Sequence, residues 1–506
     1  MTDKIMSEND GDETTTQFLK TGEDDKTLEI QPTDKKSTAK GICHQILVTV
    51  IVSFQMISLA QMLSFPAEFS PQVRNATDPP QLNLVEISWY TSVNSLTSII
   101  GSLAAGIIMD RYGRRVALIV PLVPFIIAWI ITATAKSFCV LLISRAVLGI
   151  FGGFGPPVCQ IQMAECADSA MRSSVMNVGY VSLSIGFLLT FAFGSIMSWR
   201  SLAMTGIILP ILTLVGLVLI VPESPIWLLR HDQKSKALKN LIWLRGDANI
   251  AHNELNQHSQ RLEEEKSNAQ RLPASNLWRD FCQPYALKPI VIICSFILLL
   301  NLSGTYLIVY YALDIVSKAN LAIGTQNANV ILSSVRLIVT IVFCWLFMHV
   351  RRRRIYLIAG IGSTISSFAL GYFLYKGKNA PENQTILDNW IVGSLFVIYV
   401  ASNTGFMIAP GFLTGELLPA RIRGRFAGLI YTFFSIVTFV LMKVFPLLFD
   451  QIGLVGALII FGVASLLTTA LIYFMIPETK GKSLLEIEQY FQQQGWIYRS
   501  TSTATS

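Results

Sequence analysis

Long apolar runs alternate with short polar loops along most of the chain. A helix needs about 20 predominantly apolar residues to cross the hydrocarbon core of a bilayer. Runs of this length predict an all-α membrane protein with twelve transmembrane helices. We place these spans near residues 42–65, 88–109, 116–135, 139–161, 173–195, 202–221, 289–315, 326–349, 355–377, 390–413, 425–448 and 453–476.

A polar segment divides the predicted spans into two sets of six. The segment mixes charges of both signs and predicts short helices at the membrane surface. Because six spans return the chain to the face from which it started, this segment and both termini should lie on one side. We therefore expect a disordered polar tail at 1–41, a six-helix half at 42–221, a linker with short helices at 222–288, a second six-helix half at 289–476 and a tail at 477–506.

Composition agrees with a membrane protein. Of the 506 residues, 52% are hydrophobic and 14% are charged, whereas about a quarter of the residues of a typical soluble protein are charged. The formal net charge is +7, but the basic residues lie in short loops between apolar runs. That pattern indicates membrane topology and not nucleic-acid binding. The seven cysteines are scattered over spans and loops and give no disulfide framework.

Arginine clusters indicate which face is cytoplasmic, because cytoplasmic loops hold an excess of Lys and Arg. The loops on the side of the polar segment carry Arg111, Arg114 and Arg115; Arg351 to Arg354; and Arg421, Arg423 and Arg425. Two sequons, at Asn75 and Asn383, fall in loops on the opposite side, where N-glycosylation occurs. We expect a multi-pass plasma-membrane protein that has cytoplasmic N- and C-termini and is glycosylated at both asparagines.

A charged motif occurs once in each half. Glu165 is followed seven residues later by Arg172, and Glu416 is followed at the same spacing by Arg423. Each pair stands between two apolar runs. Matched charges on one side of a duplicated bundle are what a two-position gate needs. Further charges flank the same side: Asp110, Arg114 and Arg115 between the second and third spans, and Glu223 and Glu478 after the sixth and twelfth.

The order and spacing of these motifs resemble those of the sugar porters of the major facilitator superfamily. The segments 75–77 (Asn-Ala-Thr) and 87–89 (Ile-Ser-Trp) most resemble the insect facilitated trehalose transporters. The resemblance covers about residues 42–485 and implies the major facilitator fold and sugar transport. It also implies that ion pairs join the cytoplasmic ends of the two halves when the carrier is open outward. The matching gate residues are Asp110, Arg114, Arg115, Glu165, Arg172, Glu223, Glu416, Arg423 and Glu478.

The chain departs from the sugar porters at several positions. Tyr180 stands where the family has a glutamine on the fifth span, and Gly411 where it has a tryptophan on the tenth. On the seventh span, Leu300, Asn301 and Tyr306 align with a glutamine pair and an asparagine. Amide side chains donate and accept hydrogen bonds at once, which suits sugar hydroxyls. Most of that amide set is therefore missing.

The gate motif also differs between the halves. The counterpart of the Asp110–Arg115 turn is His349–Arg354, which has lost the acidic residue and the glycine. We expect a weaker gate in the second half. Losing the charge of Glu165 or Glu416 should bias the carrier toward its inward-open form.

Candidate substrate-binding residues combine family positions with polar groups inside spans. Tyr310 and Tyr311 match the tyrosine pair of the family, next to a helix break expected at Gly304. The candidates are Tyr180, Asn301, Tyr306, Tyr310, Tyr311, Arg336, Asn403 and Gln160. Because polar groups are costly when they face lipid, we also expect Gln55, Gln61, Asn94, Gln162 and Thr404 near the cavity.

Arg336 lies well inside the eighth predicted span, and we expect no acidic residue in the core of any span to neutralise it. An arginine at this depth costs about 3 kcal/mol on insertion scales. One interpretation is that Arg336 faces the central cavity and binds a polar or anionic substrate. The other is that its guanidinium bonds to helix carbonyls or reaches a water-filled vestibule.

The expected function is facilitated diffusion of a sugar, trehalose or a hexose, through two halves that rock about a site near the bilayer midplane. The first span, 42–65, lacks the carboxylate of proton-coupled relatives, which favours uniport. The alternatives are a carrier of organic anions or other small polar metabolites on the same fold, and a non-transporting sugar sensor. The motifs give no support for an enzyme, a metal site or a cofactor. We expect a monomer whose partners are the solute and the bilayer, with no nucleic acid.

Overall fold

The computed structural model of this chain describes residues 37–74, 80–168, 170–271, 284–310, 325–379, 386–418, 423–478 and 490–491. The regular elements in these ranges are helices. Asn75, Tyr311 and Asn383 lie outside the described residues, as does the side chain of Arg423.

The first half consists of long apolar helices. They are α1 (Ala39–Arg74), α2 (Leu84–Tyr112), α3 (Arg114–Ile119) with α4 (Leu122–Thr134), α5 (Phe138–Cys166), α6 (Arg172–Gly194) and α7 (Trp199–Leu219). Asn83 and Glu86 form a reciprocal capping box at the start of α2, with N···O distances of 2.8 and 2.9 Å. Between α2 and α3, Gly113 has φ 100°, and a Cβ atom there would lie 2.4 Å from the Glu223 carboxylate. Only glycine lets Glu223 approach this turn.

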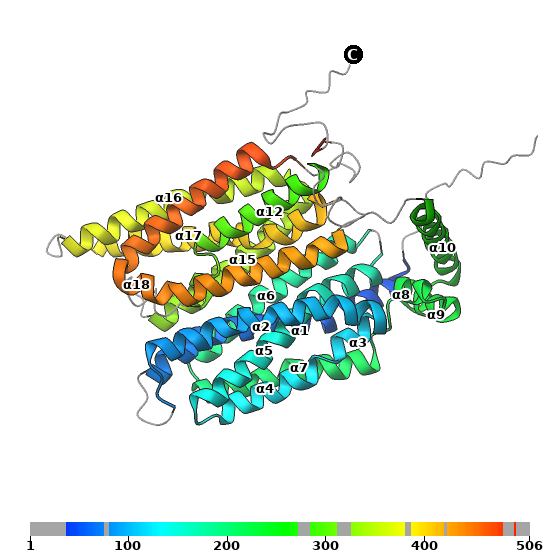
Figure 1. Cartoon of the computed structure of the whole chain (residues 1–506), viewed down its shortest axis with the longest axis horizontal. Coiled ribbons are helices and arrows are strands. Elements are labelled where there is room, and N and C mark those ends of the chain that lie inside the picture. The colour runs from blue at the N-terminus through cyan, green and yellow to red at the C-terminus, as the bar shows by residue number, and fades with distance from the viewer. Residues whose placement is uncertain are drawn as a thin grey trace, which may run out of the picture. The chain divides into compact units, whose positions relative to one another are not determined.

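Three short helices follow the first half: α8 (Pro225–Arg230), α9 (Lys234–Arg245) and α10 (Ala248–Arg271). Figure 1 shows them together beside one end of the long helices, which we call the linker end. Arg245 is 2% exposed and donates to the Cys166 carbonyl oxygen at the end of α5 (2.9 Å). Its Nε atom also lies 2.7 Å from Glu254 Oε2. Burial would raise the pKa of Glu254, but hydrogen bonds with His258 and Arg245 outweigh it and lower this pKa to about 2. The hydrogen bond from Arg245 to Cys166 therefore anchors the linker to the first half, and the ion pair with Glu254 joins α9 to α10 within the linker.

The second half contains α12 (Pro284–Leu302), α13 (Leu307–Tyr310), α15 (Thr325–His349), α16 (Arg352–Asn379), α17 (Ile386–Leu417) and α18 (Arg423–Met475). Gly304 has φ 81° and separates α12 from α13, so the expected break in the seventh span is present. Gly453 has φ 68° and ψ −178° within α18. A left-handed φ is readily adopted by glycine and by few other residues.

Eleven helices in the described ranges are long and apolar enough to cross a membrane. The difference from the predicted twelve lies in α18, whose 53 residues include both of the last two predicted spans. Its two arms meet at a sharp bend, which Figure 1 shows in orange and red. The structure agrees with the predicted duplication of a six-span unit.

The first helix differs from its predicted span in one respect that matters. It continues well beyond residue 65, to Arg74, and so includes Glu68. Glu68 is 2% exposed, and its Oε2 atom has no hydrogen-bond partner. The side chain fits because Gly194 on α6 lacks a Cβ atom, which would lie 2.5 Å from Glu68 Cγ. Glu68 is therefore a buried acidic residue in the part of α1 that continues beyond the predicted first span.

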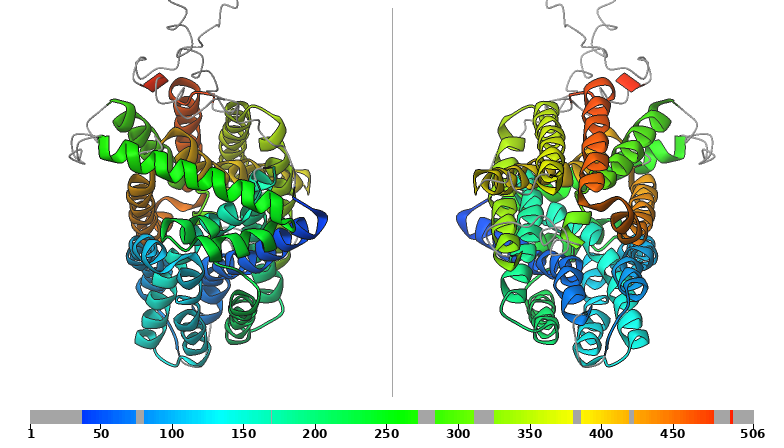
Figure 2. Two further views of the ribbon diagram at one scale, coloured as in Figure 1. Left: turned by 90° about the vertical axis from the view of Figure 1, so that its right-hand side faces the viewer. Right: turned by 90° about the vertical axis from the view of Figure 1, so that its left-hand side faces the viewer.

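The two halves pack mainly through two helix pairs. α2 packs along α18, and α6 packs along α15. The Ser184 and Thr340 hydroxyls lie 2.8 Å apart across the second pair. Figure 2 shows the helices of the first half, in blue and cyan, next to those of the second half, in yellow and orange.

Candidate functional site

A cavity of about 210 Å³ lies between the two halves. Its walls come from α1, α2, α5 and α6 of the first half and from α12, α13, α17 and α18 of the second. We call it the central cavity. No Asp, Glu, Lys, Arg or His is among the described residues that line it. The chemistry of its wall is that of hydroxyl, amide and apolar side chains.

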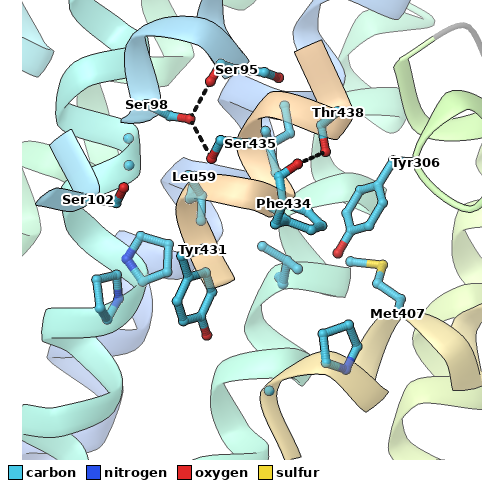
Figure 3. A pocket seen from close by; sticks show the side chains of 18 of the residues that line it. Leu59, Ser95, Ser98, Ser102, Tyr306, Met407, Tyr431, Phe434, Ser435 and Thr438 are labelled. Atoms are coloured by element: carbon cyan, nitrogen blue, oxygen red, sulfur yellow. Dashed lines mark hydrogen bonds between the residues drawn. The ribbon is translucent and has the colours of Figure 1, made fainter. Parts of the chain in front are cut away.

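Hydroxyl groups from both halves face each other across this cavity. On α2 the lining residues include Ser95, Ser98 and Ser102, which recur every three or four positions and so share one helix face. The Ser98 hydroxyl lies 2.8 Å from the Ser95 carbonyl oxygen and 3.2 Å from the Ser435 hydroxyl of α18. Figure 3 shows these contacts, together with the nearby Thr438. The site is therefore built jointly by the two halves.

Four of the predicted substrate-binding residues line the central cavity: Gln160, Tyr180, Tyr306 and Tyr310. The Tyr180 hydroxyl is hydrogen-bonded to Gln160. The first half thus contributes an amide and a phenol at one place in the wall. Both groups can donate and accept hydrogen bonds.

Asn301 and Asn403 are buried behind the wall and do not line the cavity. Asn301 Oδ1 accepts a hydrogen bond from Thr438 (3.0 Å), and Thr438 does line the cavity. Asn403 Oδ1 accepts from Thr305 (2.8 Å), while its amide nitrogen donates to Ser363 (3.1 Å). These two asparagines support the fold around the Gly304 break and position the wall residues.

Arg336 also lies outside the central cavity. It is 5% exposed and lines a separate, smaller cavity, and its guanidinium carbon lies 5.4 Å from the centre of the Phe187 ring. Side chains on a helix lean toward the helix N-terminus, and the other α15 residues in that smaller cavity precede Arg336. The interpretation that Arg336 faces the central cavity is not supported.

Tyr180 and Gly411 are neighbours, and the small size of Gly411 makes room for the large side chain of Tyr180. A Cβ atom at Gly411 would lie 1.9 Å from the Tyr180 hydroxyl oxygen, so the two residues are in direct contact between α6 and α17. The resemblance places a glutamine at the first position and a tryptophan at the second. In this chain the large aromatic group has moved from the second half to the first. The two departures from the family are therefore compensating.

Opposite the linker end, contacts between the halves close the cavity. Phe187 and Phe191 of α6 form a buried apolar cluster with Val309 and Met407 of the second half. The Tyr310 hydroxyl is hydrogen-bonded to Asn94 and Ser95 on α2. Toward the linker end, by contrast, the cavity lining continues to Ser102, Gln160 and Tyr431.

The same closed end contains a cation–π contact between the halves. Lys443 Nζ on α18 lies 3.9 Å from the centre of the Trp89 ring on α2. The Ser88 hydroxyl donates to the Lys443 carbonyl oxygen (3.2 Å). Such a contact adds about 0.5–1 kcal/mol at exposed sites. This contact and the apolar cluster together hold the two halves closed at this end.

At the linker end of the first half, the buried Arg114 contacts several carboxylates. Its Nε and Nη2 atoms bind both oxygens of Glu165 (3.0 and 3.1 Å), and its Nη1 atom lies 3.5 Å from Asp110 Oδ1. Glu223 accepts hydrogen bonds from the backbone N–H groups of Arg114 (2.8 Å) and Arg115 (3.1 Å). Burial raises the pKa of Glu223, and these backbone hydrogen bonds oppose that shift. We call this group the first charge cluster.

The second half repeats this arrangement. Arg352 forms an ion pair with Glu416, and its backbone N–H donates to Glu478 Oε1 (3.2 Å). Arg352, Glu416 and Glu478 thus correspond to Arg114, Glu165 and Glu223. The acidic residue lost from the turn is not needed for this contact, because Glu416 supplies the carboxylate from α17. Arg352 is less buried than Arg114 (23% and 4% exposed), and the weaker gate expected in the second half stays a prediction.

The ion pairs described at the linker end join spans of the same half. The other two gate arginines of the first half also contact their own half: Arg115 Nε donates to the Leu217 carbonyl oxygen (2.8 Å) and Arg172 Nε to that of Ala164 (3.1 Å). The clusters therefore brace each half, and the bridging pairs that the resemblance implies are not among the described contacts.

The family model described as "Sugar (and other) transporter" matches residues 46–491. The chain belongs to the sugar transporter family.

Individual relatives agree with this assignment. The chain is 29% identical over 466 residues to a facilitated trehalose transporter of Polypedilum vanderplanki, covering 92% of this chain and 90% of that protein. It is 28% identical to a facilitated trehalose transporter of Drosophila mojavensis, with 92% of this chain covered, but spans only 53% of that protein. The inward-open structure of the xylose transporter XylE from E. coli has a TM-score of 0.70 at 19% identity, covering 88% of this chain and 99% of that one. The last similarity shows that the fold is that of the major facilitator superfamily.

In this sugar transporter, several cavity residues were missed by the sequence argument. They are small hydroxyl residues on α2, a threonine on α17 and polar residues of α18: Ser95, Ser98, Ser102, Thr414, Tyr431, Ser435 and Thr438. The signal that could have found them is their spacing of three, four or seven positions within otherwise apolar helices. Of the polar residues expected near the cavity, Asn94 does line it. Gln61 instead donates to α7, and Gln162 donates to the Pro222 carbonyl oxygen in the segment after α7.

Proposed function

We propose that this protein carries a neutral sugar, trehalose or a hexose, across the plasma membrane by facilitated diffusion. The observation that carries the proposal is the central cavity, which has hydroxyl groups from both halves, amide groups from the first half and no charged residue among its described lining. Hydroxyl and amide groups can each donate and accept, as sugar hydroxyls do. The trehalose transporters among the relatives support this substrate class.

The mechanism we propose is alternating access. The arginine-rich linker end faces the cytoplasm, so the described form has its cavity extending toward the inside and its outer end closed. Rocking of the halves would break the contacts of Phe187, Phe191, Val309 and Met407 and open the outer end. A solute that binds both forms only has to lower the barrier between them. Asn75 and Asn383 would then lie in glycosylated outer loops, and the carrier would act as a monomer.

The proposal also concerns whether sugar transport is coupled to proton movement. No carboxylate is among the described residues of the central cavity, which supports uniport. The only acidic residue of α1 is Glu68, which is buried outside that lining. The Oε2 atom of Glu68 has no hydrogen-bond partner to which a proton could pass.

The proposed function predicts saturable uptake of neutral sugars. Purified protein in liposomes should take up trehalose or glucose and equilibrate it without accumulation. A protonophore and a change of external pH should leave the rate unchanged, because no titratable carboxylate contacts the solute. Accumulation driven by a proton gradient, and lost in Glu68→Gln, would replace uniport with symport. Uptake of carboxylates but not of sugars would support the organic-anion carrier instead.

That second function is disfavoured by the position of Arg336. An organic anion needs a cationic partner in a site at membrane depth. The described lining of the central cavity offers none, because Arg336 belongs to the smaller cavity.

A further inference from the structure

A second, smaller cavity lies within the bundle beside α15. It has a volume of about 20 Å³. Its polar wall consists of Asn329, Ser333 and Arg336, all on α15, and its apolar wall includes Phe191, Val309 and Val400. None of these residues lines the central cavity. We call it the α15 cavity.

The three polar residues form one face of α15. They stand at positions i, i+4 and i+7, which lie one above another on a helix. Arg336 is the most C-terminal of them, and helix side chains lean toward the N-terminus. Its guanidinium therefore extends toward Ser333 and Asn329. Arginine, serine and asparagine side chains all offer hydrogen-bond donors.

Two of these groups are buried without partners. Asn329 is 2% exposed, and neither its amide nitrogen nor its amide oxygen has a hydrogen-bond partner. Arg336 is 5% exposed and forms no ion pair with any residue in the described ranges. Its guanidinium lies over the ring of Phe187 and interacts electrostatically with Tyr306, and neither neighbour supplies a negative charge. An unpartnered buried amide or charge is costly. The described residues of the α15 cavity include no group that would bond to Asn329 and also neutralise Arg336.

We propose that the α15 cavity binds one small inorganic anion of the chloride class. A cavity needs about 10–15 Å³ to hold one water-sized particle, so about 20 Å³ admits a monatomic anion and excludes a sugar, a phosphate or an organic carboxylate. A water molecule would fill the same space but would leave the arginine charge uncompensated. An anion neutralises Arg336 and accepts from the Asn329 amide nitrogen at once.

The position of the cavity connects the anion to transport. Phe191 and Val309 form part of its wall and also belong to the apolar cluster that closes the end opposite the linker. Arg336 lies over Phe187 of the same cluster. A bound anion would hold Arg336 in place beneath these side chains. Bound anion should therefore stabilise the form in which that end is closed.

The test compares chloride with gluconate at constant ionic strength. The purified protein in detergent should melt at a temperature that rises with chloride concentration and saturates, because a ligand that binds only the folded state stabilises it. Bromide, which is also monatomic, should act as chloride does, and sulfate should show no saturable effect. A melting temperature that is the same in chloride and gluconate would overturn the proposal. Since this readout needs no sugar, it is independent of the proposed function.

Variants assign the effect to the α15 cavity. Arg336→Gln and Asn329→Leu should each remove most of the chloride dependence. Ser334→Ala is the matched control, because Ser334 is adjacent on the same helix but its hydroxyl donates to the Val330 carbonyl oxygen (2.8 Å) and is absent from the α15 cavity lining. If Arg336→Gln does not fold, Asn329→Leu decides alone. Chloride dependence that survives in Asn329→Leu would place the anion elsewhere and overturn the assignment.

Discussion

Gly411→Trp is expected to reduce sugar uptake by roughly 10- to 100-fold, and adding Tyr180→Gln to the same chain is expected to restore much of it. Even a Cβ atom at position 411 would lie 1.9 Å from the Tyr180 hydroxyl oxygen. An indole ring would force the phenol of Tyr180 into the central cavity that it lines. Overpacking of this kind costs about 1–3 kcal/mol, and each 1.4 kcal/mol is about tenfold in rate.

Rescue by the double variant would distinguish a local steric clash from a general loss of folding. The double variant recreates the glutamine and tryptophan that the family resemblance places at these positions, so it removes the clash while retaining the large new residue. Gly411→Ala tests the clash with the smallest side chain, and Gly415→Ala is its matched control, because a Cβ atom at Gly415 meets nothing within 4 Å. Uptake and the monodispersity of the purified protein should be measured for each. Equal uptake by Gly411→Trp and the unaltered chain would show that Tyr180 and Gly411 do not constrain each other.

Glu165→Gln should have a large effect on the stability of the first half. Glu165 holds the buried Arg114 through two charge-assisted hydrogen bonds of 3.0 and 3.1 Å. Removing one partner of a buried ion pair leaves the other charge uncompensated and costs about 3–5 kcal/mol. We expect a lower melting temperature and at least tenfold lower uptake. Glu416→Gln should follow in the same direction with a smaller effect, because Arg352 is more exposed than Arg114.

Two further variants test the reason for this effect. Asp110→Asn should change little, since Asp110 is 74% exposed and lies 3.5 Å from Arg114, and exposed ion pairs contribute about 0–1 kcal/mol. Arg114→Gln combined with Glu165→Gln should recover part of the lost stability, because the uncompensated charge is gone. If Asp110→Asn is as harmful as Glu165→Gln, the buried pair is not what stabilises the linker end.

The sequence predicts the spans well because a long apolar run in a bilayer can adopt few structures other than a spanning helix. The duplicated charge motif places Glu165 at the linker end but does not predict its partner, which is Arg114, whereas Arg172 donates to the Ala164 carbonyl oxygen. The replacement turn at His349–Arg354 was harder to interpret. Spacing within the turn cannot show that α17 delivers the carboxylate of Glu416 to Arg352 from a distant part of the chain.

The site was only partly predictable, for physical reasons that particular residues illustrate. A polar side chain inside a span avoids lipid in one of two ways. It lines the cavity, as Gln160 does, or it forms a hydrogen bond to a neighbouring helix, as Gln61 does. Sequence alone does not distinguish the two outcomes. Arg336 is polar enough to belong in a solute site, yet its direction on α15 takes it into a separate cavity. Glu68 was missed because α1 continues through Pro66 and Pro71, which usually end a helix.

The most direct test of the account is a counterflow experiment on the reconstituted protein. Liposomes are loaded with unlabelled trehalose or glucose and diluted into a trace of the same labelled sugar. A carrier whose central cavity opens to one side at a time should show a transient accumulation of label above equilibrium, and Gly411→Trp should abolish it. Label that enters without any such overshoot, in vesicles that do transport the sugar, would contradict a cavity that is exposed alternately by two rocking halves.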